Sequence, residues 1–273
     1  MYKLLKIRKL APNVREYVVE APLVAKRCKP GQFIILRVDE NGERVPFTIA
    51  DYDRERGTVT ILVQEVGYTT MLLGSKKEGD YIQDIVGPLG NPTDLDEYNN
   101  VVLVGGGIGT AVIYPQAKYL SQIGKAPLVI VGARCKELVM YEDEFEKSAK
   151  NLYIMTDDGS YKEKGFVTTK LKQLLDSDKK IDVVFAVGPM PMMRAVANLT
   201  REYGVHTIVS MNSVMVDGTG MCGGCRLTVG GETKYACVDG PEFDGHLVDF
   251  DEALNRLGYY KEIEQEHKCR LRG

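Results

Sequence analysis

Three of the six cysteines lie close together in a glycine-rich stretch of the sequence. Two residues separate Cys222 from Cys225, and eleven more intervene before Cys237. Counting back across four residues from Cys222 leads to Asp217. Plant-type two-iron ferredoxins hold their cluster with the spacing C-x4-C-x2-C and one distant cysteine, so that the backbone of the loop wraps the cluster. Asp217 stands where the first of those cysteines would be.

A carboxylate can replace a thiolate at such a site, because it is anionic at neutral pH and binds ferric iron. The spacing therefore predicts a [2Fe-2S] cluster held by Asp217, Cys222, Cys225 and Cys237. One alternative is a zinc site with three cysteines and a ligand from elsewhere. Another is that these are free structural cysteines, which is how we interpret the isolated Cys28, Cys135 and Cys269.

A second motif, "VVLVGGGIGTA", places glycines directly after an apolar strand and before a helix. Glycines at this point let the backbone approach a pyrophosphate, and the helix N-terminus supplies amide donors. A tight turn with no ligand would look the same. Two more stretches, "TDDGSYKEKGFVT" and "GPMPMM", follow other strands of the same kind, and ligands bind at the carboxyl ends of such strands. The candidate residues are Gly105, Gly106, Gly107, Gly109, Thr110, Asp157, Gly188, Pro189 and Met190.

The stretch "RVPFTIA" is a third candidate site. Because strand side chains alternate, Arg44, Pro46 and Thr48 should share one face, with Phe47 on the other. A cation, a rigid ring and a hydroxyl on one face suit a ligand with a phosphate and a polar aromatic ring, although an edge strand with a solvated arginine fits equally. Downstream, "EVGYTTMLL" places glycine and threonine at a helix start, which predicts either a phosphate cradle or a capping turn. Its residues are Gly67, Thr69 and Thr70.

Two kinds of domain must position these motifs. Residues 1–97 contain six short runs rich in Val, Ile, Tyr and Thr, separated by Pro and Gly, which predicts a small antiparallel β barrel. In residues 98–212 apolar strands alternate with helical patterns, which predicts an α/β domain with a parallel sheet. The glycine- and cysteine-rich segment 213–250 breaks this alternation, and residues 251–273 predict a polar helix.

Composition limits the function classes. The 273 residues are 44% hydrophobic and 27% charged, with a net charge of -3. No apolar run approaches the roughly 18 residues of a membrane helix, and the start of the sequence lacks the features of a signal peptide. We therefore expect a cytoplasmic protein, where clustered cysteines more often bind metal than form disulfides. No basic block with interleaved aromatic residues is present, which argues against nucleic acid as a partner.

Taken in order, the three motif regions and the cysteine segment resemble the ferredoxin-NADP reductase superfamily, in particular its branch with a C-terminal two-iron cluster. The resemblance covers nearly the whole chain. This branch includes the electron-transfer subunit of dihydroorotate dehydrogenase and the small subunit of NADH-dependent reduced ferredoxin:NADP oxidoreductases. Asp217 makes the chain more similar to the second group, since the first would be expected to carry a cysteine there. The superfamily often has a cysteine before the Gly-Pro pair, where this chain has Val187.

The resemblance implies an oxidoreductase subunit in which a barrel-bound FAD exchanges a hydride with NAD(H) and single electrons with the cluster. It implies that the flavin motif consists of Arg44, Pro46, Phe47 and Thr48, with Arg44 on the FAD pyrophosphate and Thr48 near the reactive edge of the flavin. A second FAD phosphate segment would consist of Gly67, Thr69 and Thr70. Residues 105–110 and 188–190 would bind the nicotinamide nucleotide. The implied partner is a larger flavin and iron-sulfur subunit in a heterodimer, which exchanges electrons with ferredoxin.

The choice between NAD(H) and NADP(H) depends on the end of the second strand of the predicted sheet. Arg134 could bind a 2′-phosphate, which would favour NADP(H). The acidic run Glu142, Asp143 and Glu144 disfavours added phosphate charge if it lies nearby. Together with the resemblance, the acidic run predicts NAD(H).

Overall fold

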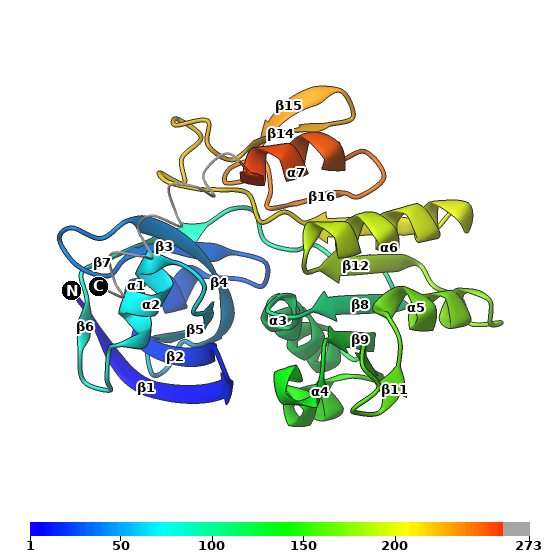
Figure 1. The fold of residues 1–273 in the computed structure, drawn as a ribbon, viewed down its shortest axis with the longest axis horizontal. Helices are drawn as coiled ribbons and strands as arrows, with labels where there is room; N and C mark the ends of the chain where they lie inside the picture. The colour runs from blue at the N-terminus through cyan, green and yellow to red at the C-terminus, as the bar shows by residue number, and fades with distance from the viewer. Residues whose placement is uncertain (259–273) are drawn as a thin grey trace.

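The computed structural model describes residues 1–258, which form two seven-stranded sheets and one two-stranded sheet. In Figure 1 the N-terminal strands, coloured blue to cyan, lie beside a green and yellow α/β domain. The orange C-terminal segment lies along the side of both. No helix among the described residues is both long and apolar enough to cross a membrane.

The first sheet is antiparallel throughout, with the strand order β6-β1-β2-β5-β4-β3-β7. Its two edge strands, β6 and β7, are consecutive in the chain and only Gln83 separates them, so the sheet curls until its edges meet. This confirms the predicted antiparallel barrel, with the sixth predicted strand divided in two. The strands are β1 (Tyr2–Ala11), β2 (Val14–Glu20), β3 (Phe33–Arg37), β4 (Arg44–Asp53), β5 (Thr58–Gln64), β6 (Tyr81–Ile82) and β7 (Asp84–Leu89).

Two short helices accompany the barrel, α1 (Pro22–Arg27) and α2 (Tyr68–Gly74). The barrel interior is filled by large apolar side chains that alternate along the strands, as a half-buried strand requires. Tyr17, Ile34, Leu36 and Ile61 are among those with no exposed surface.

The second sheet has the order β11-β10-β9-β8-β12-β13-β16 and is parallel apart from its last strand. Strand order reverses between β8 and β12, where a doubly wound sheet opens a crevice at its carboxyl edge. The strands are β8 (Val101–Gly106), β9 (Leu128–Ala133), β10 (Asn151–Thr156), β11 (Glu163–Lys164), β12 (Val183–Val187), β13 (His206–Ser210) and β16 (Glu242–Asp244). The helices are α3 (Gly109–Gln122), α4 (Glu142–Ser148), α5 (Val167–Leu175) and α6 (Met190–Glu202), with a 3-10 turn η1 (Lys136–Leu138).

The parallel sheet and its three main helices were predicted, because their apolar runs are long and regular. Every residue of β8 and β12 is buried, as expected for strands covered by helices on both faces. Helix α4, whose seven residues begin with the acidic run, was not predicted. Acidic residues in a first helical turn are a known start signal, and that signal could have identified this helix.

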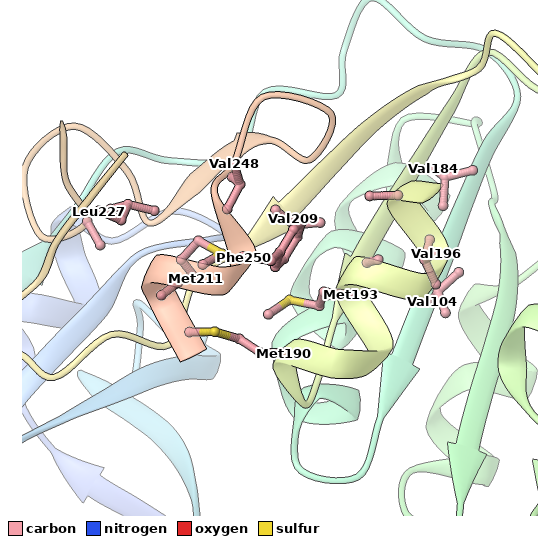
Figure 2. Close-up of a cluster of buried hydrophobic side chains, with 14 of the residues drawn as sticks. Val104, Val184, Met190, Met193, Val196, Val209, Met211, Leu227, Val248 and Phe250 are labelled. Atoms are coloured by element: carbon pink, nitrogen blue, oxygen red, sulfur yellow. The ribbon is translucent and has the colours of Figure 1, made fainter. Parts of the chain in front are cut away.

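The C-terminal segment contains the hairpin β14 (Arg226–Val229) and β15 (Glu232–Tyr235), the edge strand β16 (Glu242–Asp244) and the helix α7 (Phe250–Gly258). Figure 2 shows how a continuous apolar cluster joins this segment to the α/β domain. Phe250 of α7 packs with Met190 and Met193 of α6 and with Met211. The helix predicted over 251–273 is present up to Gly258, and the remainder of that prediction lies outside the described residues.

Candidate functional site

Strand β4 presents the "RVPFTIA" residues as the alternation predicts. Thr48 and Pro46 lie opposite Phe33 and Ile35 of β3, whereas Phe47 lies opposite Ile34. Residues that pair directly across an antiparallel ladder place their side chains on the same face. Phe47 therefore packs with the barrel core, and Pro46 and Thr48 share the outer face with Phe33 and Ile35. This outer face belongs to the apolar cluster that continues into the C-terminal segment.

The cysteine-bearing loop rests on this same face of the barrel. Arg44 donates a hydrogen bond of 2.9 Å from Nε to the carbonyl oxygen of Val216. Gly218 is packed so closely that an added Cβ would lie 2.8 Å from Ile35 Cδ1. The predicted flavin strand and the predicted cluster loop, far apart in sequence, are therefore in direct contact.

The start of α2 lies beside the start of β4. Thr69 is buried and its hydroxyl donates to Glu43 Oε2 at 3.3 Å, which links the two elements. The Thr70 hydroxyl accepts from the Val66 and Gly67 amides at 3.0 and 2.9 Å and donates to the Gly67 carbonyl. Thr70 therefore caps the helix, and the first-turn amides remain the groups that could meet a phosphate.

The glycine loop after β8 meets the loop after β12, as predicted. Val187 lies opposite Gly105 in the parallel ladder. Gly109 sits against the backbone of Val187 and Gly188, where an added Cβ would come within 2.8 Å of the Gly188 nitrogen. Thr110, at the start of α3, is almost completely buried. The two loops and α6, which begins at Met190 after the N-cap Pro189, can thus pack together. The glycines that permit this are Gly105, Gly106, Gly109 and Gly188.

Gly107 differs from these neighbours. Its φ is +55°, and an added Cβ would meet nothing within 4 Å. Gly107 is therefore the glycine of this loop whose backbone faces open space at the carboxyl edge of the sheet. Asp157 is exposed at the same edge, where its amide donates to the Ala133 carbonyl at 3.1 Å.

The residues that bear on nucleotide choice are also near this edge. Arg134 is exposed immediately after β9. Glu142 accepts from the Tyr161 hydroxyl at 3.0 and 3.1 Å and pairs with Lys162 at 3.2 Å. Glu144 instead pairs with Arg8 of the barrel at 3.0 Å. Two residues of the acidic run therefore have different partners. Glu142 contacts the loop after β10, and Glu144 contacts the barrel at the domain interface.

Two of the predicted cluster ligands lie together. The sulfur atoms of Cys225 and Cys237 are both buried and 3.3 Å apart. Burial, reinforced by the neighbouring Cys225 thiol, raises the pKa of Cys237 to about 12. A thiolate here therefore needs a compensating cation. Cys222 is exposed on the same loop, where its sulfur accepts from the Gly224 amide at 3.5 Å.

Asp217 is held within the loop by backbone amides. Its Oδ1 accepts from Thr219 at 2.9 Å, and its Oδ2 accepts from Cys222 at 2.8 Å. These hydrogen bonds, with the Thr219 amide first, hold the pKa of Asp217 below its ordinary value. The carboxylate is thus ionised and tied to the loop that carries Cys222.

The chemical types of these four donor groups suit an iron-sulfur cluster, but their positions do not yet surround one metal site. The set consists of two adjacent buried thiols, a third thiol and an ionised carboxylate. Asp217, Cys222 and Cys225 lie on one loop, whose glycines at 218, 220 and 223 have positive φ, and Cys237 follows the hairpin of β14 and β15. Within residues 1–258, however, no three His, Cys, Asp or Glu side chains are gathered around one metal position. Cys222 and Asp217 would have to turn toward Cys225 and Cys237 to complete the ligand set.

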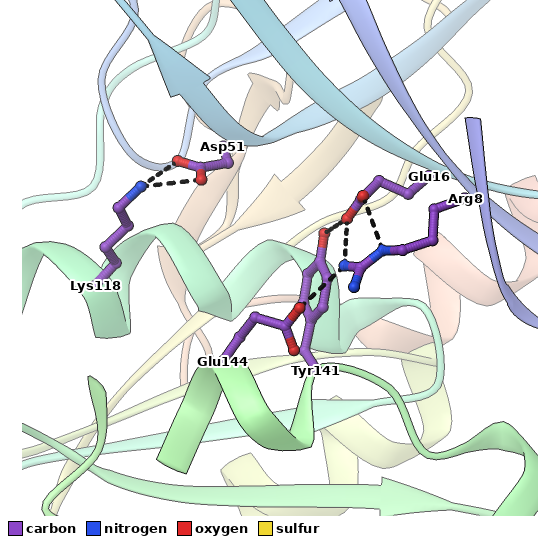
Figure 3. A network of polar contacts seen from close by, with 6 residues as sticks. All are labelled: Arg8, Glu16, Asp51, Lys118, Tyr141 and Glu144. Carbon is purple, nitrogen blue, oxygen red and sulfur yellow. Dashed lines mark hydrogen bonds and ion pairs between the residues drawn. The ribbon is translucent and has the colours of Figure 1, made fainter. Parts of the chain in front are cut away.

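Figure 3 shows the polar contacts that join the barrel to the α/β domain. Arg8 binds Glu16 through two hydrogen bonds of 3.1 and 2.9 Å, and the Tyr141 hydroxyl donates to Glu16 Oε2 at 2.7 Å. A second contact pairs Lys118 of α3 with Asp51 of β4 at 2.8 Å. These pairs hold α3 and the start of α4 against the barrel, and sequence spacing provided no signal for them.

Comparisons with known proteins agree with both halves of this arrangement. Residues 1–93 match the family described as the oxidoreductase FAD-binding domain. Residues 212–249 match the family described as the iron-sulfur cluster binding domain of dihydroorotate dehydrogenase B. These matches support an FAD site on the barrel and an iron-sulfur cluster in the cysteine segment, and they favour iron over the zinc alternative.

Several proteins resemble the whole chain. The electron transfer subunit homolog of dihydroorotate dehydrogenase B from Thermotoga maritima is 48% identical over 96% of this chain and 93% of its own length. The electron transfer subunit from Fusobacterium nucleatum is 36% identical over 83% of this chain and 89% of its own length. A solved structure reported for flavin-based electron bifurcation by the NADH-dependent reduced ferredoxin-NADP oxidoreductase superposes with a TM-score of 0.95. It shares 46% identity and covers all of this chain and 98% of that one.

Proposed function

Because the chain belongs to the family of the dihydroorotate dehydrogenase B electron-transfer subunits and their homologues, we propose that it carries electrons between NAD(H) and a partner subunit through FAD and a [2Fe-2S] cluster. It is an oxidoreductase subunit. Its similarity to the structure of an NADH-dependent reduced ferredoxin-NADP oxidoreductase favours a role as a subunit of an electron-bifurcating complex of that type. A dihydroorotate dehydrogenase is the alternative host, since several similar proteins are named as its electron transfer subunit.

One observation carries the proposal: the strand with the flavin motif and the loop with the cysteines touch each other. Arg44 reaches Val216, and Gly218 lies on Ile35 and Leu89 of the barrel. In the α/β domain, the backbone at Gly107 faces open space at the carboxyl edge of the second sheet. A flavin on the outer face of β4 would therefore lie beside the cluster loop, and the nucleotide would bind at the loop around Gly107.

When bound, FAD can take up two electrons as a hydride and pass them on singly, which neither a nicotinamide nor an iron-sulfur cluster can do alone. The residues of this chain would bind the cofactors and orient them. Arg44 would bind the FAD pyrophosphate, Thr48 would lie at the flavin edge, and the first amides of α2 after Gly67 would meet further phosphate. The backbone at Gly107 would approach the dinucleotide. No residue of the chain needs to act as an acid or a base.

The nucleotide we propose is NAD(H). Glu142 lies at the loop after β10 and neutralises Lys162, which leaves less positive charge for a 2′-phosphate at this edge. Arg134 is the opposing group. Flavin reduction measured with NADH and with NADPH tests this choice, and a clear preference for NADPH would contradict it.

The partner we propose is a larger subunit with its own flavin and iron-sulfur clusters, forming a heterodimer that exchanges electrons with ferredoxin. The similar proteins are named as electron transfer subunits, and the similar structure is that of an NADH-dependent reduced ferredoxin-NADP oxidoreductase. Isolating the tagged chain from its own cells and identifying what co-purifies distinguishes the two hosts. A dihydroorotate-oxidising subunit would point to the alternative.

The test of the electron-transfer function uses the chain purified without oxygen. We expect one FAD, and about two iron and two sulfide ions, per chain. NADH should bleach the flavin absorbance, and an EPR signal of a reduced two-iron cluster should follow. Stoichiometric zinc without iron, or a flavin that NADH cannot reduce, would contradict the proposal.

A further inference from the structure

Four segments from three parts of the molecule meet at a place that none of the predicted sites includes. The barrel contributes Gly31, and the linker between β7 and β8 (residues 90–100) contributes Thr93. Helix α3 contributes Gln116, and β16 contributes Glu242. An added Cβ on Gly31 would collide with both the Thr93 hydroxyl and the Glu242 carboxyl group. Gln116 is 1% exposed. The junction is therefore tightly packed around a small set of polar atoms.

The polar atoms of the junction form a chain of hydrogen bonds. Glu242 Oε1 lies 2.5 Å from Thr93 Oγ1, and Thr93 Oγ1 lies 2.8 Å from the side-chain amide of Gln116. The Gln116 amide also faces the Val112 carbonyl and the Gly31 backbone amide. A carbonyl can only accept and a backbone amide can only donate. Gln116 must therefore point its Nε2 at Val112 and its Oε1 at Gly31, at 3.1 Å.

This orientation of Gln116 determines where each proton lies in the series of hydrogen bonds from Gln116 through Thr93 to Glu242. Gln116 Oε1 accepts from the Thr93 hydroxyl at 2.8 Å, so the single proton of that hydroxyl is used. Thr93 Oγ1 can then only accept from Glu242. A carboxylate has no proton to donate, and two acceptors at 2.5 Å would repel each other. The contact therefore requires Glu242 to be a neutral carboxylic acid whose O–H donates to Thr93.

The surroundings of Glu242 agree with a neutral group. Burial raises its pKa to about 8, opposed only by the Thr93 hydrogen bond. The groups that face it from the barrel loop, the linker and α3 are the neutral Gly31, Thr93 and Gln116. No charged group of the described residues shifts its pKa. Asp244, two residues along β16, binds the His246 amide at 2.9 Å.

The junction also holds the chain that leaves the cluster loop. Four residues separate Glu242 from Cys237, and the linker binds this intervening segment. The Asn91 amide donates to the Gly240 carbonyl at 2.7 Å, and its side chain donates to the carbonyls of Val238 and Asp239. The linker is bound in turn to the barrel, since the Thr93 amide donates to the Pro30 carbonyl at 2.9 Å.

We propose that Glu242 is a proton-dependent positioning residue: as a neutral acid it fastens the segment after Cys237 to the linker and α3, and its ionisation loosens that contact. Loss of the proton places a second acceptor beside Thr93 and leaves a buried charge without a partner. The cluster loop then loses one of its attachments to the barrel. Given the proposed function, the transfer that should respond is that between flavin and cluster, whereas hydride uptake by the flavin should not.

The first experiment mixes NADH rapidly with the full chain, loaded with FAD and cluster, between pH 6 and 9.5. Flavin reduction is followed by absorbance, and cluster reduction by freeze-quench EPR. Above pH 8 the wild-type rate of cluster reduction should fall by up to about tenfold per pH unit, the limit for loss of one proton. Glu242→Gln keeps a hydrogen-bond donor at every pH and should abolish this fall while keeping the rate seen at pH 6. Asp244→Asn, on the same strand, is the matched control and should behave as wild type.

A second measurement is independent of electron transfer. Amide hydrogen exchange of Asn91 and Thr93 reports the linker contacts directly, and comparing two proteins at one pH cancels the intrinsic effect of hydroxide. At pH 9 these amides should exchange at least several-fold faster in wild type than in Glu242→Gln, with no difference at pH 6. Identical pH profiles for wild type and Glu242→Gln in both measurements would overturn the proposal. If NADH reduced no cluster at any pH, the electron-transfer function would fail, and the exchange data would still decide the role of Glu242.

Discussion

The Nε atom of Arg44 donates a 2.9 Å hydrogen bond to the carbonyl oxygen of Val216, although 172 residues separate the two in the sequence. Arg44 begins the strand predicted to hold the flavin, and Val216 directly precedes the predicted ligand Asp217. The two remaining guanidinium nitrogens of Arg44 can still bind a phosphate in the two-pronged geometry that arginine favours. A single side chain thus connects the proposed flavin site to the proposed cluster loop.

Replacing this arginine should disturb both cofactors at once. Lysine keeps the charge in Arg44→Lys but lacks the forked donors and the Nε atom. Losing one charge-assisted hydrogen bond costs about 1.5 kcal/mol, so we expect roughly tenfold weaker FAD binding together with a changed EPR signal of the cluster. Arg37→Lys, directly opposite on β3, is the matched control. Unchanged FAD affinity, measured by fluorescence titration of the FAD-free chain, would exclude the assigned role.

Asp217 can be tested as a ligand by three substitutions. Asp217→Cys should keep the cluster but change its potential and EPR spectrum, because a thiolate donates more electron density to iron than a carboxylate does. Asp217→Ala should make the cluster labile. Asp217→Asn keeps one oxygen for the loop amides but loses the charge, so it separates ligation from loop support. Full iron content with an unaltered spectrum in the Ala variant would show that the carboxylate is not a ligand.

The open glycine of the nucleotide loop has a close structural counterpart elsewhere. Gly107 and Gly204 have φ of +55° and +65°, and an added Cβ at either would meet nothing within 4 Å. Alanine at either position should cost a similar ~1 kcal/mol of stability, because both need a left-handed backbone. Only Gly107→Ala should weaken NADH binding, since Gly204 follows α6 at the other end of the domain. Equal KM values for NADH in the two variants would place the nucleotide elsewhere.

Two of the polar contacts between the domains should differ in strength. Tyr141→Phe removes the hydroxyl that donates to the buried Glu16, at a cost of about 1–2 kcal/mol. Lys118→Met breaks a partly exposed ion pair, and such pairs contribute less than about 1 kcal/mol. Thermal unfolding should therefore show a clearly lower Tm for the tyrosine variant, with a drop of roughly 2–4 °C per kcal/mol. The opposite order would mean that the Asp51–Lys118 pair dominates the interface.

Glu242 should also make stability depend on pH in a definite direction. Its pKa is about 8 in the folded chain against an ordinary 4.5. Between these values the folded state holds the proton and the unfolded state does not. The free energy of unfolding should therefore decrease as pH rises from about 4.5 to about 8, by at most ~1.4 kcal/mol per pH unit, and then level off. Urea unfolding of wild type relative to Glu242→Gln isolates this contribution, and a difference that does not vary with pH would refute it.

Much of the fold follows from local sequence. The alternating strands of residues 1–97 can bury one face each only by curling into a sheet, and the fully apolar β8 and β12 can be covered only by helices on both sides. The glycines from 105 to 109 and the spacing of Cys222, Cys225 and Cys237 are equally local, because a short loop must have these residues in this order to do its chemistry. Such features are determined by the sequence by itself.

The contacts between these parts were decided by the tertiary structure. Arg44 meets Val216, Thr93 meets Glu242 and Glu16 meets Tyr141 across separations of 172, 149 and 125 residues. No periodicity or spacing relates residues so far apart, since each pair depends on how whole domains pack. The proton on Glu242 is the clearest case. Its charge state follows from burial and from the donors and acceptors of Thr93 and Gln116, which become its neighbours only when the barrel, α3 and the C-terminal segment come together.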